Sequence, residues 1–173
     1  MSRLIIICGL PGTGKTLLSN ELSKKTSIFC IHKDTIKESL YKTMGLSSLE
    51  DSKKIGYPSI KVMLDVAGEN VSRGIDVILE APFTFPDEGL IFSQWKEKYN
   101  LSVYSIILNL DGETRKSRFL NRQRDPCHHD NERIDPQPVV ETKFEHMPEK
   151  RIILTTNKSI DQLIDDILAI IKL

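Results

Sequence analysis

Gly9-Leu10-Pro11-Gly12-Thr13-Gly14-Lys15-Thr16 matches the pattern G-x-x-x-x-G-K-[ST] at every fixed position. The glycines let the backbone turn tightly and point its N–H groups at a phosphate, and the N-terminus of the next helix adds positive charge. Lys15 would reach the β- and γ-phosphates of a nucleoside triphosphate, and the Thr16 hydroxyl would face Mg²⁺. We therefore expect ATP and Mg²⁺ as ligands of this loop. The residues expected to bind the nucleotide are Gly9, Pro11, Gly12, Thr13, Gly14, Lys15, Thr16 and Leu17.

The flanks of this loop agree with its motif. Leu4 to Cys8 is a continuous apolar run, typical of a strand that is buried on both faces. A helix is predicted over about 14–25, with Leu18 and Leu22 four residues apart. The alternative is a Gly-rich turn that binds nothing, and the strand before it and the helix after it argue against that interpretation.

The rest of the chain alternates between strand and helix patterns. Further strands are predicted at 28–31, 75–81, 103–110 and 151–155. Helices are predicted from near Thr35 to Met44, from Ile60 to Val71, from Pro86 onward, over Arg115 to Arg124 behind a cap at Asp111, and after a Ser159/Gln162 capping box. Such alternation builds a parallel sheet that helices cover on both faces. We expect an α/β fold with a five-stranded parallel sheet, in a single domain over residues 1–173.

Composition limits the classes of protein that remain. The 173 residues include 24 basic and 24 acidic side chains, so the formal net charge is zero, and 39% of the residues are apolar. These values are typical of one soluble globular domain without a general attraction to nucleic acid or an anionic membrane. The apolar run at the N-terminus is too short for a signal peptide or a membrane span. Cys8, Cys30 and Cys127 form no C-x-x-C pair, which favours free thiols in a reducing cytoplasm.

Two acidic residues follow predicted strands at the edge where ligands bind in open α/β sheets. Asp34 comes after the second strand and could accept the proton of a substrate hydroxyl that attacks the γ-phosphate. It could equally cap the helix that starts near Thr35, and the two roles are compatible. Glu80 ends the third strand and could hold Mg²⁺ or its water, or contact substrate. The alternative for Glu80 is a salt bridge at the end of a strand.

A basic segment predicts a lid over about 112–138. It contains, within ten residues and without an acid, Arg115, Lys116, Arg118, Arg122 and Arg124. Arg118 and Arg122 are four apart and would project from one helix face, where two guanidiniums suit the charge of a transferring phosphoryl group. Arg124 is a third candidate, and Arg115 and Lys116 are expected on the surface. The alternative is a solvated basic helix face, and the proline-rich segment 125–138 is predicted as a loop.

Two further groups of residues have less specific patterns. Cys127-His128-His129-Asp130 is interpreted as an exposed or substrate-contacting loop rather than a zinc site, because adjacent histidines rarely reach one ion. Phe83 and Phe85 could line an acceptor pocket or pack in the core, and Trp95 is expected to pack.

Together these motifs resemble those of small P-loop kinases of the polynucleotide-kinase-like group, often described as AAA-domain ATPases or zeta-toxin-like kinases. The resemblance rests on Gly9 to Thr16, Ile31 to Lys37, Arg118-x-x-x-Arg122 and Thr155-Thr156-Asn157. It implies a P-loop NTPase three-layer sandwich with strand order 2-3-1-4-5, with Asp34 as general base and with Arg118 and Arg122 as lid residues on the phosphates. Asn157 would join the nucleotide-binding residues.

The chain also departs from polynucleotide kinases. They tend to carry arginine near the base, where this chain has Lys33 and Lys37. Ala81-Pro82-Phe83 replaces the polar or acidic cluster that follows their third strand. Both differences argue against a nucleic-acid acceptor.

The leading hypothesis is therefore an ATP-dependent kinase that transfers the γ-phosphate to a hydroxyl of a small-molecule or nucleotide-like acceptor. Its expected catalytic residues are Lys15, Asp34, Arg118 and Arg122, and its expected metal-binding residues are Thr16 and Glu80. Alternatives are a polynucleotide 5′-hydroxyl kinase, a nucleoside monophosphate kinase, or a nucleotide-dependent ATPase switch that moves a partner. Neither the acceptor nor the oligomeric state follows from the sequence.

Overall fold

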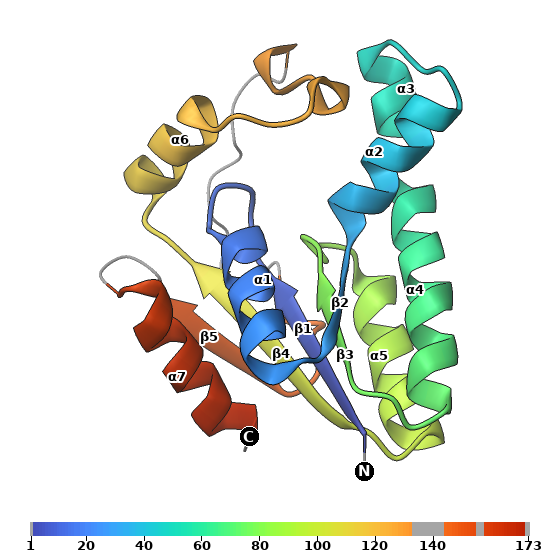
Figure 1. The fold of residues 1–173 in the computed structure, drawn as a ribbon, viewed down its shortest axis with the longest axis vertical. Coiled ribbons are helices and arrows are strands. Elements are labelled where there is room, and N and C mark those ends of the chain that lie inside the picture. Colours follow the sequence, from blue (N-terminus) through green and yellow to red (C-terminus); the bar gives the residue numbers. More distant parts are fainter. Residues whose placement is uncertain (1, 133–143, 155–157, 172–173) are drawn as a thin grey trace.

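A computed structural model describes residues 2–132, 144–154 and 158–171 of the chain (Figure 1). Within these residues, five parallel strands form one sheet in the order β2-β3-β1-β4-β5. The strands are β1 (Arg3–Cys8), β2 (Phe29–His32), β3 (Val77–Glu80), β4 (Ser102–Asn109) and β5 (Lys150–Leu154). The expected α/β class with a parallel sheet is confirmed, and the strand order is the one that the family resemblance implies. The third strand is shorter than predicted, because Ile75 and Asp76 precede it and Ala81 follows it.

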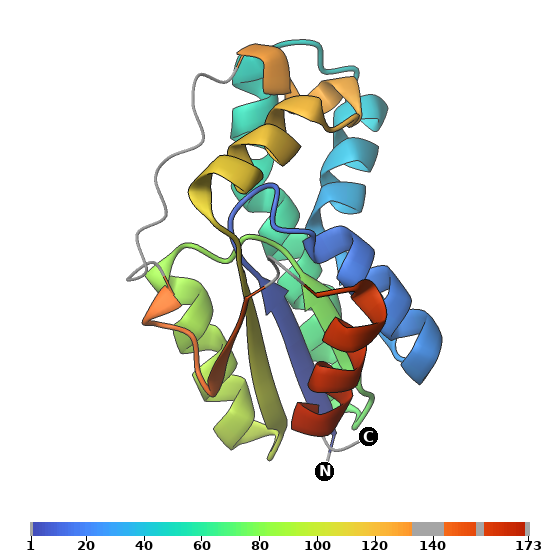
Figure 2. The same ribbon diagram turned by 90° about the vertical axis from the view of Figure 1, so that its left-hand side faces the viewer.

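Helices cover both faces of this sheet (Figures 1 and 2). Helices α1 (Lys15–Thr26) and α7 (Ile160–Ile171) pack on one face, where Leu18, Leu22 and Ile167 join the strand residues Ile5 and Ile7 in one apolar cluster. Helices α4 (Gly56–Ser72) and α5 (Pro86–Lys98) pack on the other face. Alternate residues of β1 thus enter opposite cores, as expected for a central strand.

The second core contains several aromatic side chains. Phe83 and Phe92 are fully buried, and their rings meet edge to face with centroids 5.2 Å apart. Trp95 packs against the same cluster, as predicted. Phe85 is largely exposed instead. Phe83 therefore packs in the core rather than lining an acceptor pocket.

The remaining described helices lie beyond the carboxyl ends of the strands (Figure 1). They are α2 (Lys33–Thr43), α3 (Leu49–Lys54), α6 (Gly112–Asn121) and two short 3-10 segments, η1 (Pro126–His128) and η2 (Asp130–Glu132). Helix α3 was not predicted; it has less than two turns and a capping box between Ser48 and Asp51. The predicted helix through Arg124 is wrong, because α6 ends at Asn121.

Local capping signals in the sequence are confirmed. The Asp111 side chain accepts a hydrogen bond from the Thr114 N–H at 2.8 Å and caps α6. Ser159 and Gln162 form the reciprocal bonds of a capping box before α7. None of the described helices is both long and apolar enough to cross a membrane.

Glu88 is a buried acid in the first turn of α5. One carboxylate oxygen accepts a hydrogen bond from the Phe85 N–H at 2.9 Å, and the other has no hydrogen-bond partner among the described residues. Its burial raises the pKa of Glu88 to about 7. The folded protein therefore carries an acid that resists ionisation near neutral pH.

This burial predicts a pH dependence of stability. A folded-state pKa above the unfolded value contributes stability that is complete below about pH 4.5 and is lost as the pH rises through about 7. Glu88→Gln keeps the hydrogen bond to Phe85 but cannot ionise. Across this pH range, its free energy of unfolding should therefore decrease by about 2 to 3 kcal/mol less than that of wild type. Urea denaturation across the range measures this. Phe92→Leu, a buried substitution without a titratable group, is the control: it should lower the free energy of unfolding but leave its dependence on pH as in wild type. The prediction is contradicted if Glu88→Gln also has the pH dependence of wild type.

Candidate active site

The phosphate-loop motif connects the carboxyl end of β1 to the start of α1. Gly9, Gly12 and Gly14 have φ of +140°, +90° and +94°, values that side chains rarely adopt. A Cβ at Gly9 would lie 2.5 Å from the Leu108 carbonyl oxygen of β4, and one at Gly12 would lie 2.9 Å from that of Arg115 on α6. Glycine is thus needed at these two positions for close packing as well as for the turn.

Lys15 is directed along the loop. Its side chain is 8% exposed, and its ammonium donates a hydrogen bond to the Leu10 carbonyl oxygen at 3.1 Å. Burial lowers the pKa of Lys15, while the nearby carboxylates of Glu80 and Asp34 oppose that shift. The Thr13 hydroxyl donates to the same carbonyl at 2.9 Å. Thr13 therefore stabilises the loop that presents Lys15.

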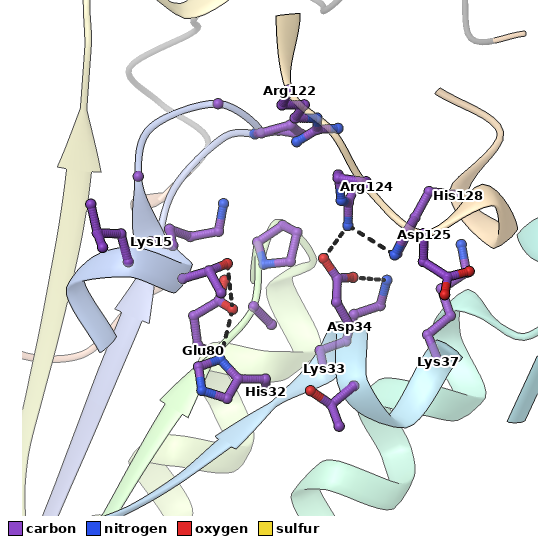
Figure 3. A pocket seen from close by; sticks show the side chains of 18 of the residues that line it. Lys15, His32, Lys33, Asp34, Lys37, Glu80, Arg122, Arg124, Asp125 and His128 are labelled. Carbon is purple, nitrogen blue, oxygen red and sulfur yellow. Dashed lines mark hydrogen bonds and ion pairs between the residues drawn. The ribbon is translucent and has the colours of Figure 1, made fainter. Parts of the chain in front are cut away.

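Glu80 and Thr16 meet at the level of this loop. The Thr16 hydroxyl donates to the Glu80 carboxylate at 3.2 Å, and His32 Nδ1 lies 3.1 Å from the same oxygen (Figure 3). Hydrogen bonds to Cys30 and to Glu80 raise the pKa of His32 to about 10. A hydroxyl beside a buried carboxylate is a set of oxygen donors that suits Mg²⁺. The residues present therefore fit the cation that the loop motif implies.

Asp34 lies in the first turn of α2, which begins at Lys33. The helix has His32 as its N-cap without a side-chain hydrogen bond, so the interpretation of Asp34 as the cap is wrong. Its carboxylate accepts a hydrogen bond from Lys33 at 3.2 Å and forms an ion pair with Arg124 (Figure 3). Burial alone would raise the pKa of Asp34, but Arg124 and Lys33 bring it well below its usual range.

The arginines of the lid differ from their predicted arrangement. Arg122 caps the carboxyl end of α6 with extended backbone, so it does not share a helix face with Arg118. Its guanidinium pairs with Asp130 at 2.9 Å and lies 4.2 Å from the centre of the Phe119 ring. Arg118 is exposed on α6. Arg115, expected on the surface, is buried where α6 packs on Gly12.

The segment after α6 attaches the lid to α2. Asp125 forms an ion pair with Lys42 at 2.6 Å, and the Tyr41 hydroxyl lies 2.8 Å from His129 Nε2. Cys127 packs with Tyr41 and Ile55 in a small apolar cluster. Because α6 ends at Asn121, the residues after it run from beside the phosphate loop to α2 and line the cavity between them.

His128 and Glu38 were not predicted as site residues. His128 is buried, and its Nε2 lies 3.0 Å from a Glu38 carboxylate oxygen and 3.2 Å from Arg124. Burial, and then the positive charge of Arg124, lower the pKa of His128. The sequence signal was the Cys127–Asp130 stretch, interpreted as a loop that could contact substrate, but nothing in it indicated Glu38 as a partner.

These groups line one cavity of about 670 Å³. Among the predicted nucleotide and catalytic residues, the cavity wall includes Pro11, Gly12, Gly14, Lys15, Thr16, Leu17, Asp34, Glu80, Arg118 and Arg122. Gly9 and Thr13 shape the loop without lining the cavity. Asn157, the other predicted nucleotide-binding residue, lies outside the described residues. Lys33, Lys37, Glu38, Arg124, Asp125 and His128 line the side opposite the phosphate loop, around Asp34.

A glycine-rich loop between a buried strand and a helix, at the carboxyl edge of a parallel sheet, defines a P-loop nucleotide-binding protein. The chain matches the AAA domain family over residues 4–147 and belongs to it. This agrees with the small P-loop group that its motifs resemble. No curated protein matches the chain.

Solved structures with the same fold include several kinases. A protein of Chloroflexus aurantiacus assigned as a kinase is 22% identical, with a TM-score of 0.77 and 97% of each chain covered. The APS kinase of Mycobacterium tuberculosis, solved with AMPPNP and APS, is 12% identical, with a TM-score of 0.67 over 99% of this chain and 98% of its own. A sugar kinase of Janibacter sp. HTCC2649 is 14% identical, with a TM-score of 0.59 over 99% and 95%. Such identities show a shared fold.

The close approach of Gly12 to the lid predicts a difference between two glycine substitutions. Gly12→Ala adds a Cβ 2.9 Å from the Arg115 carbonyl oxygen at a positive φ, whereas Gly74→Ala meets only the strain of its φ of +80°. Gly74→Ala should lower the free energy of unfolding by about 1 to 2 kcal/mol. Gly12→Ala should cost at least about 1 kcal/mol more, because α6 must also shift. Denaturant titration without nucleotide tests this, and equal losses would contradict the packing of α6 on the loop.

Proposed function

We propose that this protein is an ATP-dependent kinase that transfers the γ-phosphate to a hydroxyl group of a small-molecule or nucleotide-like acceptor. The observation that carries the proposal is the cavity that joins the phosphate loop to Asp34. A phosphate group on the loop would lie on one side of this cavity, and an acceptor hydroxyl near Asp34 would lie on the other. The kinases among the structures of the same fold support this choice.

The loop would bind the triphosphate. Lys15 donates a hydrogen bond to the Leu10 carbonyl oxygen and would exchange it for the β- and γ-phosphates. The oxygens of Thr16 and Glu80 would hold Mg²⁺, which neutralises phosphate charge when bound. Arg122 and the exposed Arg118 line the same cavity and would stabilise charge on the transferring group. The ion pair with Asp130 and the contact with the Phe119 ring orient the Arg122 guanidinium.

Asp34 would act as the general base. The acceptor oxygen would attack the γ-phosphorus, its proton would pass to the Asp34 carboxylate, and ADP would leave with the electron pair of the broken P–O bond. The side of the cavity around Asp34 alternates hydrogen-bond donors and acceptors, with Lys33, Lys37, Glu38 and His128 in its wall. Such a wall favours a polar acceptor with several hydroxyl groups.

Two substitutions test the proposal. Asp34→Asn should lower phosphoryl transfer by about 10²- to 10⁴-fold and leave ATP affinity within about threefold, because it removes the base and retains the loop. Lys15→Met should weaken ATP binding itself. Lys116→Gln, on the exposed side of α6, is the matched control and should behave as wild type.

The measurement is transfer of labelled γ-phosphate to a panel of sugars, sugar acids, nucleosides, nucleoside monophosphates and 5′-hydroxyl oligonucleotides, beside ATP affinity by calorimetry. Transfer that survives Asp34→Asn would remove Asp34 as base. Labelling of the oligonucleotides alone would instead support a polynucleotide kinase. Tight ATP binding without transfer to any class of acceptor would count against the proposal.

A further inference from the structure

Arg124 lies between two carboxylates. It forms an ion pair with Asp34 on α2 (Figure 3), and its second terminal nitrogen is 3.5 Å from Asp130 Oδ2 on η2. Its side chain is 22% exposed, and it belongs to the non-helical segment between α6 and η1. Arg124 is therefore a cation that the lid places directly on the proposed base.

The ion pair with Arg124 affects the ability of Asp34 to accept a proton. The charged or titratable groups that face Asp34 are Lys33 on its own helix, Arg124 and Arg122 after α6, His128 on η1 and Lys15 on α1. Burial raises the pKa of Asp34, and Arg124, Lys33 and His128 together lower it by more. A carboxylate that is held by a guanidinium accepts a proton poorly. With Arg124 in this position, Asp34 is a weak base.

Asp130 offers Arg124 a second partner. Its Oδ2 accepts the hydrogen bond from Arg122 Nε at 3.0 Å. Its Oδ1 is buried, and no described residue donates a hydrogen bond to it. A buried carboxylate oxygen without a donor is costly, so a guanidinium that turned toward it would gain a strong hydrogen bond. Arg124 already lies within reach of this carboxylate.

We propose that Arg124 is a positioning residue that blocks Asp34 while the acceptor site is empty and moves to Asp130 when an acceptor hydroxyl binds Asp34. The inference rests on the proposed kinase function and adds a control to the same site. Its benefit is the suppression of idle hydrolysis. In that reaction a water oxygen attacks the γ-phosphorus, its proton passes to Asp34, and ADP leaves with the electron pair of the broken P–O bond, giving ADP and inorganic phosphate.

The experiment measures phosphate release from MgATP without any acceptor. Arg124→Gln removes the cation and frees Asp34, so phosphate release should rise by about threefold or more over wild type. Arg124→Lys keeps a positive charge near Asp34 and should stay closer to wild type than Arg124→Gln. Lys116→Gln, an exposed cation on the same lid, should match wild type. Thermal unfolding of each variant confirms that it is folded.

A double-mutant cycle shows whether the effect passes through Asp34. In an Asp34→Asn background, Arg124→Gln should no longer increase phosphate release. An increase that persists there, or phosphate release in Arg124→Gln that equals or falls below wild type, would overturn the inference. If Arg124→Gln does not fold, Arg124→Met, which keeps an apolar stem and removes the charge, gives the same comparison.

A second readout separates this inference from the kinase proposal. The carboxyl carbon of Asp34, followed by NMR as the pH falls, should titrate about one unit or more higher in Arg124→Gln than in wild type. An unchanged titration would overturn the inference even if transfer to an acceptor is found. Failure of the kinase proposal has a different signature, namely ATP binding without transfer to any class of acceptor.

Discussion

The parallel register of β2, β3 and β1 is the constraint on which the site depends. Ile7, Glu80 and His32 are register partners at the carboxyl ends of these strands. Because the phosphate loop leaves β1 at the next residues, Thr16 at the start of α1 meets Glu80, and Asp34 lies two residues beyond His32. A shift of one residue in this register would turn Glu80 to the opposite face of the sheet. The loop, the candidate cation ligands and the candidate base would then no longer share a cavity.

The lid forms another part of the wall of the same cavity. It packs on the phosphate loop at one end, where Arg115 covers Gly12, and on α2 at the other, where Asp125 pairs with Lys42 and Cys127 joins Tyr41. One short segment therefore contacts both the phosphate loop and α2. That segment also presents Arg122 and Arg124, whose shared partner is Asp130. A change in the position of the Asp130 carboxylate would therefore alter the ion pairs of both Arg122 and Arg124.

The features that were predicted correctly have a local signal in the sequence. The loop motif needs only eight adjacent residues, the alternation of strands and helices follows from apolar periodicity, and the caps at Asp111 and Ser159 depend on spacings of three. The predictions were wrong where the placement of a side chain depends on the residue at which a helix ends. Helix α6 stops at Asn121, and this moved Arg122 off the predicted face. The burial of Arg115 was equally unpredictable, because it arises from the approach of α6 to a glycine far away in the chain.

The amino-acid sequence alone determined the class of fold, the single phosphate loop with Lys15 and Thr16, and the two acidic residues worth considering, Asp34 and Glu80. Only the tertiary structure decided which arginine meets which acid. Ion pairs such as Arg124 with Asp34 join residues 90 positions apart, and neither composition nor periodicity carries information about such distances. The tertiary structure also excluded Asp34 as the cap of α2, since this helix starts at Lys33, and it placed Asp34 in the wall of the cavity. The physical reason is that local preferences act over a few residues, whereas charges are paired by the packing of the whole chain.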